Sequence, residues 1–101
     1  MKLYLISDDS ETLTGMRLVG IEGVFADNSE DLKAAVESSV KDEEIGVILI
    51  TENLVSRCTE LVYKYKINLK RPLIVEIPSK NSVRQTDSIT RYVRDALGVK
   101  I

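Results

Sequence analysis

Apolar residues fall into four short runs along this chain, and longer segments with helical periodicity separate the runs. The runs cover residues 3–6, 21–25, 45–50 and 73–77. The third run, Ile-Gly-Val-Ile-Leu-Ile, has no polar alternation, which is typical of a parallel-sheet strand covered on both faces. Strands that alternate with helices form βαβ units. The pattern therefore predicts an α/β fold: a four-stranded parallel sheet with helices on both faces and a C-terminal helix.

Helix signals occur in the segments between and after the runs. Asn28 is a favourable N-cap, and Asp31 stands at the third helical position, where it completes a box-like pairing. The first helical segment has lower propensity because it contains Gly15. A last helix is predicted over residues 83–97. A third helix is expected to start near Glu52 and to continue as one element, with an apolar face made of Leu54, Val55, Cys58, Leu61, Val62 and Tyr65.

Length and composition exclude several classes of protein. With 101 residues, the chain is predicted to form one domain, residues 1–101, with a sheet core over about 1–80 and a C-terminal helix and tail over about 81–101. The net charge of −2 gives no sign of affinity for nucleic acid. Histidine is absent, and the single cysteine cannot form an internal disulfide. No apolar stretch approaches the roughly 20 residues that span a bilayer. We therefore expect a cytoplasmic protein without a cofactor, a metal, bound nucleic acid or direct membrane insertion.

The acidic pair Asp8 and Asp9 follows the first strand, where receiver domains of phosphorelay signalling hold magnesium. A receiver also needs an aspartate at the end of its third strand to accept phosphate, and this chain has Thr51 there. The receiver lysine at the end of a fifth strand has no counterpart, since Lys80 follows the fourth run. An aspartate beside a helix start is usually a cap. We therefore interpret the pair as caps and keep a receiver-like signalling domain that binds Mg²⁺ and phosphate as the alternative function.

Other candidate residues have structural interpretations. Glu52 in the first turn of a helix is explained by the helix dipole, and Glu76 is expected to face a sheet edge or a partner. Cys58 lies on an apolar helix face and is interpreted as a small buried hydrophobe. The basic stretch 64–71 is interpreted as the solvated end of a helix, with phosphate or an acidic partner as the other possibility. Tyr63 lies off the apolar face, and aromatic residues are enriched in interfaces. These residues form no nucleophile–base pair, so catalysis is not predicted.

Three motifs, spread over the whole chain, carry a family resemblance. They are T-G-M-R-L-V-G-I-E-G at residues 14–23, I-L-I-T-E at 48–52 and P-L-I-V-E-I-P-S at 72–79. In this order the motifs resemble those of the F subunit of V-type (archaeal and bacterial A/V-type) rotary ATPases, with methionine and valine replacing the more usual phenylalanine and alanine of the first motif. Gly15 and Gly20 are expected to let the first helix end tightly and approach the second strand.

The resemblance implies a small Rossmann-like, receiver-like fold without receiver chemistry. It implies a non-catalytic central-stalk (rotor) subunit that binds the long coiled-coil D subunit and helps couple ATP hydrolysis or synthesis to H⁺ or Na⁺ transport. Contacts with the catalytic A/B head and the stalk-ring adaptor subunit, and a place peripheral to the membrane, are implied as well. Partner contacts are then expected from the outward side of the last helix, the tail and two earlier positions, namely Arg84, Arg91, Arg94, Val99, Lys100, Ile101, Arg17 and Tyr63.

Overall fold

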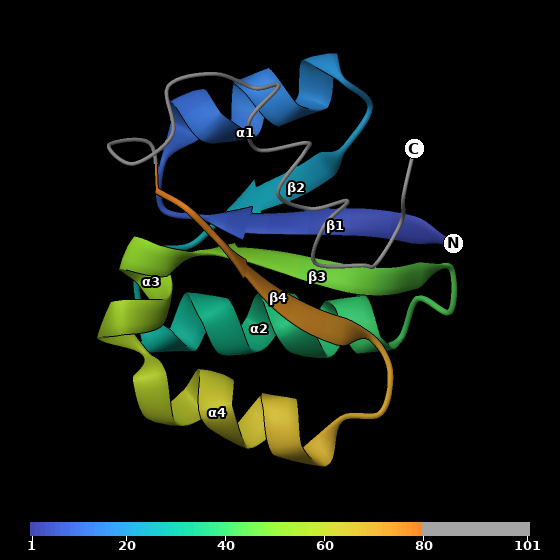
Figure 1. Ribbon diagram of the computed structural model, residues 1–101, viewed down its shortest axis with the longest axis vertical. Coiled ribbons are helices and arrows are strands. Elements are labelled where there is room, and N and C mark those ends of the chain that lie inside the picture. The colour runs from blue at the N-terminus through green and yellow to red at the C-terminus, as the bar shows by residue number, and fades with distance from the viewer. Residues whose placement is uncertain (80–101) are drawn as a thin grey trace.

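The computed structural model describes residues 1–79, which form four strands and four helices (Figure 1). The strands are β1 (Lys2–Ser7), β2 (Glu22–Phe25), β3 (Ile45–Thr51) and β4 (Leu73–Ile77). The helices are α1 (Ser10–Leu18), α2 (Ser29–Val40), α3 (Glu52–Arg57) and α4 (Thr59–Asn68). Each predicted run matches its strand to within one residue at either end. The helix predicted over residues 83–97 lies outside the described residues.

All neighbouring strands of the sheet are parallel, in the order β2-β1-β3-β4. Ile6 pairs with Val24 on one side and with Ile50 on the other, and Thr51 pairs with Ile77. The prediction of a four-stranded parallel sheet is therefore confirmed. β2 lies on one side of β1, whereas β3 and β4 lie on the other side. The strand order therefore reverses between β1 and β3.

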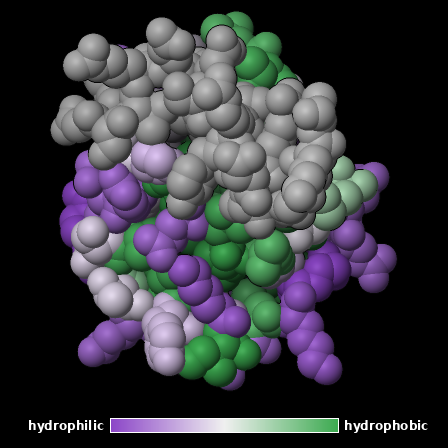
Figure 2. Space-filling model, viewed as in Figure 1, coloured by the Kyte–Doolittle hydropathy of each residue, from purple (hydrophilic) through white to green (hydrophobic). Residues whose placement is uncertain are grey.

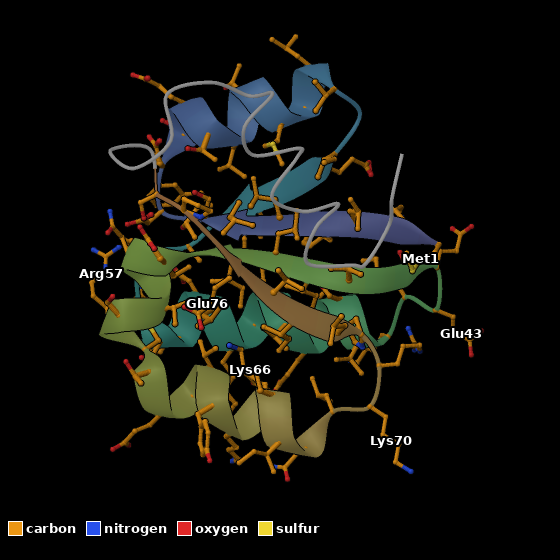
Figure 3. All side chains as sticks on the ribbon, in the orientation of Figure 1. Met1, Glu43, Arg57, Lys66, Lys70 and Glu76 are labelled. Atoms are coloured by element: carbon orange, nitrogen blue, oxygen red, sulfur yellow. The ribbon has the colours of Figure 1, made fainter. Side chains whose placement is uncertain are left out.

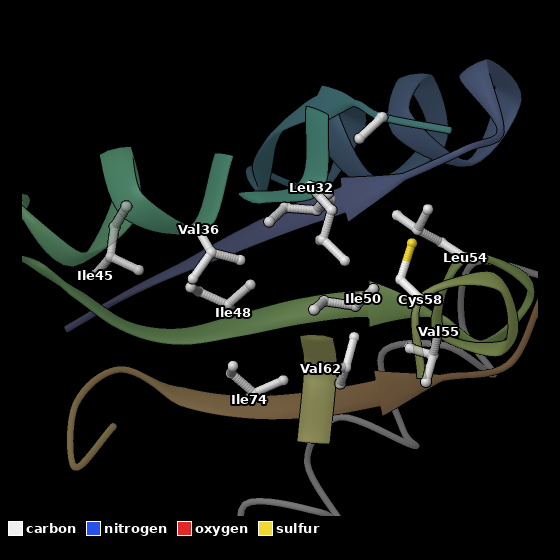
Figure 4. Close-up of a cluster of buried hydrophobic side chains, with 12 residues drawn as sticks. Leu32, Val36, Ile45, Ile48, Ile50, Leu54, Val55, Cys58, Val62 and Ile74 are labelled. Atoms are coloured by element: carbon white, nitrogen blue, oxygen red, sulfur yellow. The ribbon is translucent and has the colours of Figure 1, made fainter. Parts of the chain in front are cut away.

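Helices lie on both faces of the sheet, as predicted. In Figure 1, α1 lies above the sheet, whereas α2 and α4 lie below it, with α3 at the end of β3. The buried cluster on the α1 side contains Leu5, Leu13, Met16, Val47, Leu49 and Ile77. The larger cluster, on the other side, packs α2, α3 and α4 against β1, β3 and β4 (Figure 4). Burial of this apolar surface is the main stabilising contribution to the fold.

Both ends of α1 are capped, which offsets the low helix propensity of its sequence. The Asp9 carboxylate accepts hydrogen bonds from the Glu11 backbone N–H at 3.3 Å and from the Thr12 hydroxyl at 2.6 Å. At the other end, Gly20 has a φ of 91° and donates its N–H to the Arg17 carbonyl at 3.0 Å, while the Ile21 N–H reaches the Met16 carbonyl at 2.9 Å. This pair of bonds is a Schellman motif, and its left-handed residue favours glycine. The predicted tight end at Gly20 is confirmed.

The predicted box at the start of α2 is also confirmed. The Asn28 side-chain oxygen accepts the Asp31 backbone N–H at 2.8 Å, and the Asn28 amide donates to the Asp31 carboxylate at 3.1 Å. These bonds satisfy a backbone donor at the helix N-terminus, which otherwise lacks an intrahelical partner.

The prediction of one continuous third helix is wrong, because the helix breaks at Cys58. This residue has a φ of −128° and a ψ of 37°, and its N–H is shared between the Leu54 and Val55 carbonyls at 3.1 Å. The Thr59 hydroxyl donates to the carbonyls of Val55 and Ser56, so it replaces main-chain donors that a continuous helix would supply. The break separates α3, which contacts β3 and β4, from α4, which contacts β4. The apolar residues keep helical spacing across the break, so periodicity gave no sign of it.

Candidate functional site

The carboxyl edge of the sheet between β1 and β3 is the place where a site is expected. Open α/β sheets bind their ligands at this edge, at the point where the strand order reverses. In this chain the reversal brings together Ser7, which ends β1, Asp8, which follows it, and Thr51, which ends β3. Ser7 and Thr51 are almost fully buried, with 0% and 1% of their surface exposed.

Hydrogen bonds and one ion pair connect the polar groups at this edge to one another. The Thr51 hydroxyl donates to the Asp8 carboxylate at 3.2 Å and lies 3.4 Å from the Ser7 hydroxyl oxygen. That oxygen in turn accepts the Asp9 backbone N–H at 3.0 Å. Arg57 of α3 forms an ion pair with the other Asp8 carboxylate oxygen. These bonds connect the end of β1 to the end of β3 and to α3.

A second set of bonds connects the end of β4 to the start of α3. The Ser79 hydroxyl oxygen accepts the Asn53 backbone N–H at 2.9 Å, and the Glu52 carboxylate accepts the Ser79 backbone N–H at 3.3 Å. Thr51, the N-cap residue of α3, makes no side-chain capping bond of its own. Ser79 therefore takes the role of the cap from a position 26 residues further along the chain. The sequence could not show this cap, because N-cap signals are read from adjacent residues.

The acidic pair is thus divided between two structural roles. Asp9 is the N-cap of α1, which confirms the cap interpretation for this residue. Asp8 is bonded to Arg57 and Thr51 instead, so the cap interpretation is wrong for this residue. Within residues 1–79, no three side chains of the His, Cys, Asp or Glu type are grouped so that they could hold a metal ion.

The structure also shows the surroundings of Glu76, Cys58 and Arg71, which the sequence analysis had considered. Glu76 of the edge strand β4 forms an ion pair with Lys66 at 2.7 Å, so its side chain is directed toward α4. Cys58 is buried, which confirms its interpretation as a small hydrophobe. In the basic stretch, Arg71 has a structural role that the sequence did not predict. Its guanidinium donates to the backbone carbonyls of Val40, Asp42 and Ile45 at 3.2, 3.4 and 3.0 Å.

Two tyrosines and one exposed ion pair have shifted pKa values. Burial raises the pKa of Tyr4, and so does the nearby Glu22 carboxylate. Burial is also the main cause of the raised pKa of Tyr65. Near the start of β1, the Glu44 backbone N–H and the Lys2 ammonium, which lies 3.2 Å away, lower the pKa of Asp42. None of these groups lies at the carboxyl edge of the sheet.

The predicted partner contacts are only partly within the described residues. Tyr63 lies on α4 with 64% of its surface exposed, and Arg17 is exposed in the last turn of α1. Tyr63 and Arg17 come from different helices on opposite faces of the sheet, so they do not form one patch. Outside the described residues are Arg84, Arg91, Arg94, Val99, Lys100 and Ile101.

Comparison with known proteins gives a consistent result over nearly the whole chain. Residues 3–93 match the family model for the ATP synthase (F/14-kDa) subunit. The chain is 33% identical over 96 residues to the A-type ATP synthase F subunit of Methanococcus maripaludis (strain DSM 14266), with 92% of each chain covered. It is 31% identical over 103 residues to the F subunit of Pyrococcus abyssi (96% of this chain, 95% of the relative) and 31% identical over 107 residues to that of Thermococcus kodakarensis (100% and 98%).

The chain belongs to the family of ATP synthase (F/14-kDa) subunits. The resemblance inferred from the three motifs is therefore confirmed, and each motif now has a structural explanation. The first motif holds the Schellman end of α1 at Gly20 and the close approach of β2 to β1 at Gly23. The close approach was expected at Gly15 and Gly20, whereas an added Cβ at Gly23 would lie 2.5 Å from the Leu5 carbonyl oxygen. The second and third motifs contain Thr51 and Ser79, which hold the carboxyl edge together.

Membership of this family makes the chain an accessory subunit of a rotary ATPase complex. In residues 1–79, no helix is long and apolar enough to cross a membrane.

Proposed function

We propose that this chain is a non-catalytic central-stalk (rotor) subunit of a V-type rotary ATPase. In this role it binds the long coiled-coil D subunit and helps couple ATP hydrolysis or synthesis to the transport of H⁺ or Na⁺. It lies in the cytoplasmic, membrane-peripheral part of the complex, next to the catalytic A/B head and the stalk-ring adaptor subunit. The observation that carries the proposal is the match to F subunits of A-type ATP synthases along at least 92% of the chain.

The geometry of the sheet edge supports a mechanical role. A ligand site at the reversal point needs polar groups that remain available to the ligand. In this chain Asp8, Thr51 and Ser79 bind neighbouring strands and helices instead. These bonds stiffen the end of the sheet, and a part that transmits torque must not deform when it is loaded.

A durable interface with the stalk is the second requirement. Stable protein interfaces bury on the order of 1,600 Å² in total, or more when the complex is permanent. The proposed contact residues on the last helix and in the tail, namely Arg84, Arg91, Arg94, Val99, Lys100 and Ile101, would contribute part of this area. Arg17 and Tyr63 are proposed as further contacts from the described part of the chain.

Affinity purification from native membranes tests the proposal. A tagged copy of the chain is expected to recover a long coiled-coil stalk protein in constant ratio, together with the ATPase head. Recovery of a histidine kinase instead, or of no coiled-coil protein, would refute the rotor assignment. As a second test, truncation after Leu97 is expected to leave the fold intact and to change the ATPase activity or coupling of a reconstituted motor.

A further inference from the structure

Helix α3 is short, so its order depends on contacts outside the helix. It has six residues, of which Leu54 and Val55 are buried in the larger core cluster. A helix of this length is not stable in isolation, because its first turn fixes several residues for a single hydrogen bond. Figure 2 shows hydrophilic side chains on the surface at the end of the molecule where α3 lies. The helix is therefore held by two buried side chains and by the polar groups that bind its ends.

The start of α3 is held by a reciprocal pair of bonds with the chain that follows β4. The Ser79 hydroxyl oxygen accepts the Asn53 backbone N–H at 2.9 Å, and the Glu52 carboxylate accepts the Ser79 backbone N–H at 3.3 Å. This exchange resembles a capping box, in which a serine and a glutamate side chain bind backbone donors reciprocally. In an ordinary capping box both residues belong to one turn of the chain. We call this arrangement of Glu52, Asn53 and Ser79 the split box.

The other polar contacts of α3 do not replace the split box. Thr51, at the N-cap position, makes no capping bond, and its hydroxyl contacts Asp8 and Ser7 instead. At the far end, Arg57 forms an ion pair with Asp8, but 51% of the Arg57 side chain is exposed, and exposed ion pairs contribute little to stability. Figure 3 shows Arg57 at the end of the molecule opposite Met1. The first turn of α3 is therefore ordered mainly by the split box.

We propose that the split box is a latch, which makes the order of α3 depend on the path of the chain as it leaves β4. Ile77 is the last residue of β4 that pairs with β3, and Ser79 follows two residues later. The position of Ser79 is thus set by the chain beyond the sheet, not by strand pairing. With Ser79 in place, the first turn of α3 is capped. When Ser79 is displaced, the Asn53 N–H loses its acceptor, and α3 loosens while the four strands stay paired.

The latch connects two distant parts of the molecule. Residues 80–101 follow Ser79 directly, so a partner that binds them and changes the direction in which the chain leaves β4 acts on α3. A loosened α3 also weakens the contact between Arg57 and Asp8, which follows β1. Because such coupling is reciprocal, any contact that stabilises α3 also holds Ser79 in place. The latch is a property of the chain by itself and does not depend on its place in a motor.

Hydrogen exchange of the full-length chain, measured for each amide by NMR at low urea concentrations, tests the latch. Ser79→Ala removes the acceptor of the Asn53 N–H, whereas Ser79→Thr keeps a hydroxyl at this position. Ser56→Ala is the matched control, because it removes a hydroxyl of α3 that bonds to the Glu52 carbonyl of the same helix at 2.9 Å. Far-UV circular dichroism of each variant shows whether it is folded.

We expect Ser79→Ala to increase the exchange rates of the α3 amides by about 2- to 30-fold, the range that corresponds to the loss of a helix cap. In this variant the α3 amides are expected to exchange faster than those of β1 and β3 and with less dependence on urea, because α3 opens by itself. Ser56→Ala and Ser79→Thr are expected to stay within about threefold of the wild type. Unchanged α3 exchange in Ser79→Ala, or the same increase in Ser56→Ala, would refute the latch. So would α3 amides that open only together with the strands.

Two insertions of a single glycine separate the position of Ser79 from its chemistry. An insertion between Pro78 and Ser79 moves the hydroxyl relative to Asn53, whereas an insertion between Ser79 and Lys80 adds the same residue beyond the split box. We expect the first insertion to accelerate α3 exchange as Ser79→Ala does, and the second to leave it within about threefold of the wild type. If the two insertions have equal effects, the path of the chain beyond β4 does not control α3, and the proposal is wrong.

Discussion

Replacement of Gly23 by alanine tests how the first motif holds the sheet together. Gly23 pairs with Leu5 in the β1–β2 register, and a Cβ at this position would lie 2.5 Å from the Leu5 carbonyl oxygen and 2.8 Å from Leu13 Cδ2. Cβ contacts under 3.0 Å are essentially never found, so β2 would have to shift by at least about 0.5 Å against its neighbour. Such overpacking typically costs about 1–3 kcal/mol.

Gly46 provides a matched control in β3. A Cβ there would meet only the side chain of Met1, which is flexible and 89% exposed and can therefore move aside. Neither Gly23 nor Gly46 has a positive φ, so alanine is compatible with both backbones. Alanine also restricts the unfolded chain to a similar degree at both positions, an effect of about 0.4–1 kcal/mol in favour of folding.

Urea unfolding followed by far-UV circular dichroism measures the difference. We expect Gly23→Ala to lower the free energy of unfolding by about 1–3 kcal/mol, and Gly46→Ala to leave it within about 1 kcal/mol of the wild type. For a domain of this size each kcal/mol corresponds to roughly 4–8 °C in Tm. If the two variants are equally stable, the close approach of β2 to β1 does not explain why glycine occupies position 23.

Three further predictions concern the ends of secondary-structure elements. Gly20→Ala is expected to lower the free energy of unfolding by about 1 kcal/mol, because alanine is strained at a φ of 91°. Urea unfolding measures this change, and an unchanged free energy of unfolding would exclude strain at this turn. Arg71→Ala is expected to lower the free energy of unfolding by about 1–2 kcal/mol, because three backbone carbonyls lose their hydrogen-bond donor. Arg71→Lys is expected to restore only part of this free energy. Full restoration by lysine would show that the positive charge alone is responsible. The lowered pKa of Asp42 implies a contribution to the free energy of unfolding that is present above the ordinary pKa of aspartate and is lost as the pH falls through the folded-state pKa. In Asp42→Asn, the free energy of unfolding is therefore expected to fall less steeply with decreasing pH than in the wild type. An unchanged pH dependence in the acid range would contradict this.

Much of the fold follows from local features of the sequence. The third run has no polar alternation, which fits a strand covered on both faces, and the caps at Asp9 and Asn28 lie within three residues of the groups they bond. Gly20 could likewise be recognised, because a Schellman motif involves only adjacent turns of chain. Family membership was also readable from the motifs, since they span the whole length of the chain.

Other features depend on contacts between residues far apart in the sequence. The break at Cys58 does not disturb the apolar spacing, so the sequence predicted one helix where the structure has two, α3 in contact with β3 and β4 and α4 in contact with β4. Ser79 caps a helix that begins 27 residues earlier, and Arg71 binds carbonyls about 30 residues away. No local pattern encodes such bonds.

The sequence alone therefore determined the class of sheet, the order of its elements, the absence of histidine chemistry and the family. Only the tertiary structure decided that Asp8 and Thr51 are bonded to each other rather than left open at the sheet edge, and that Tyr63 and Ile67 face solvent together. The physical reason is that hydrophobic periodicity and capping act over a few residues, whereas the strand order, which brings distant polar groups together, is decided by the packing of the whole chain.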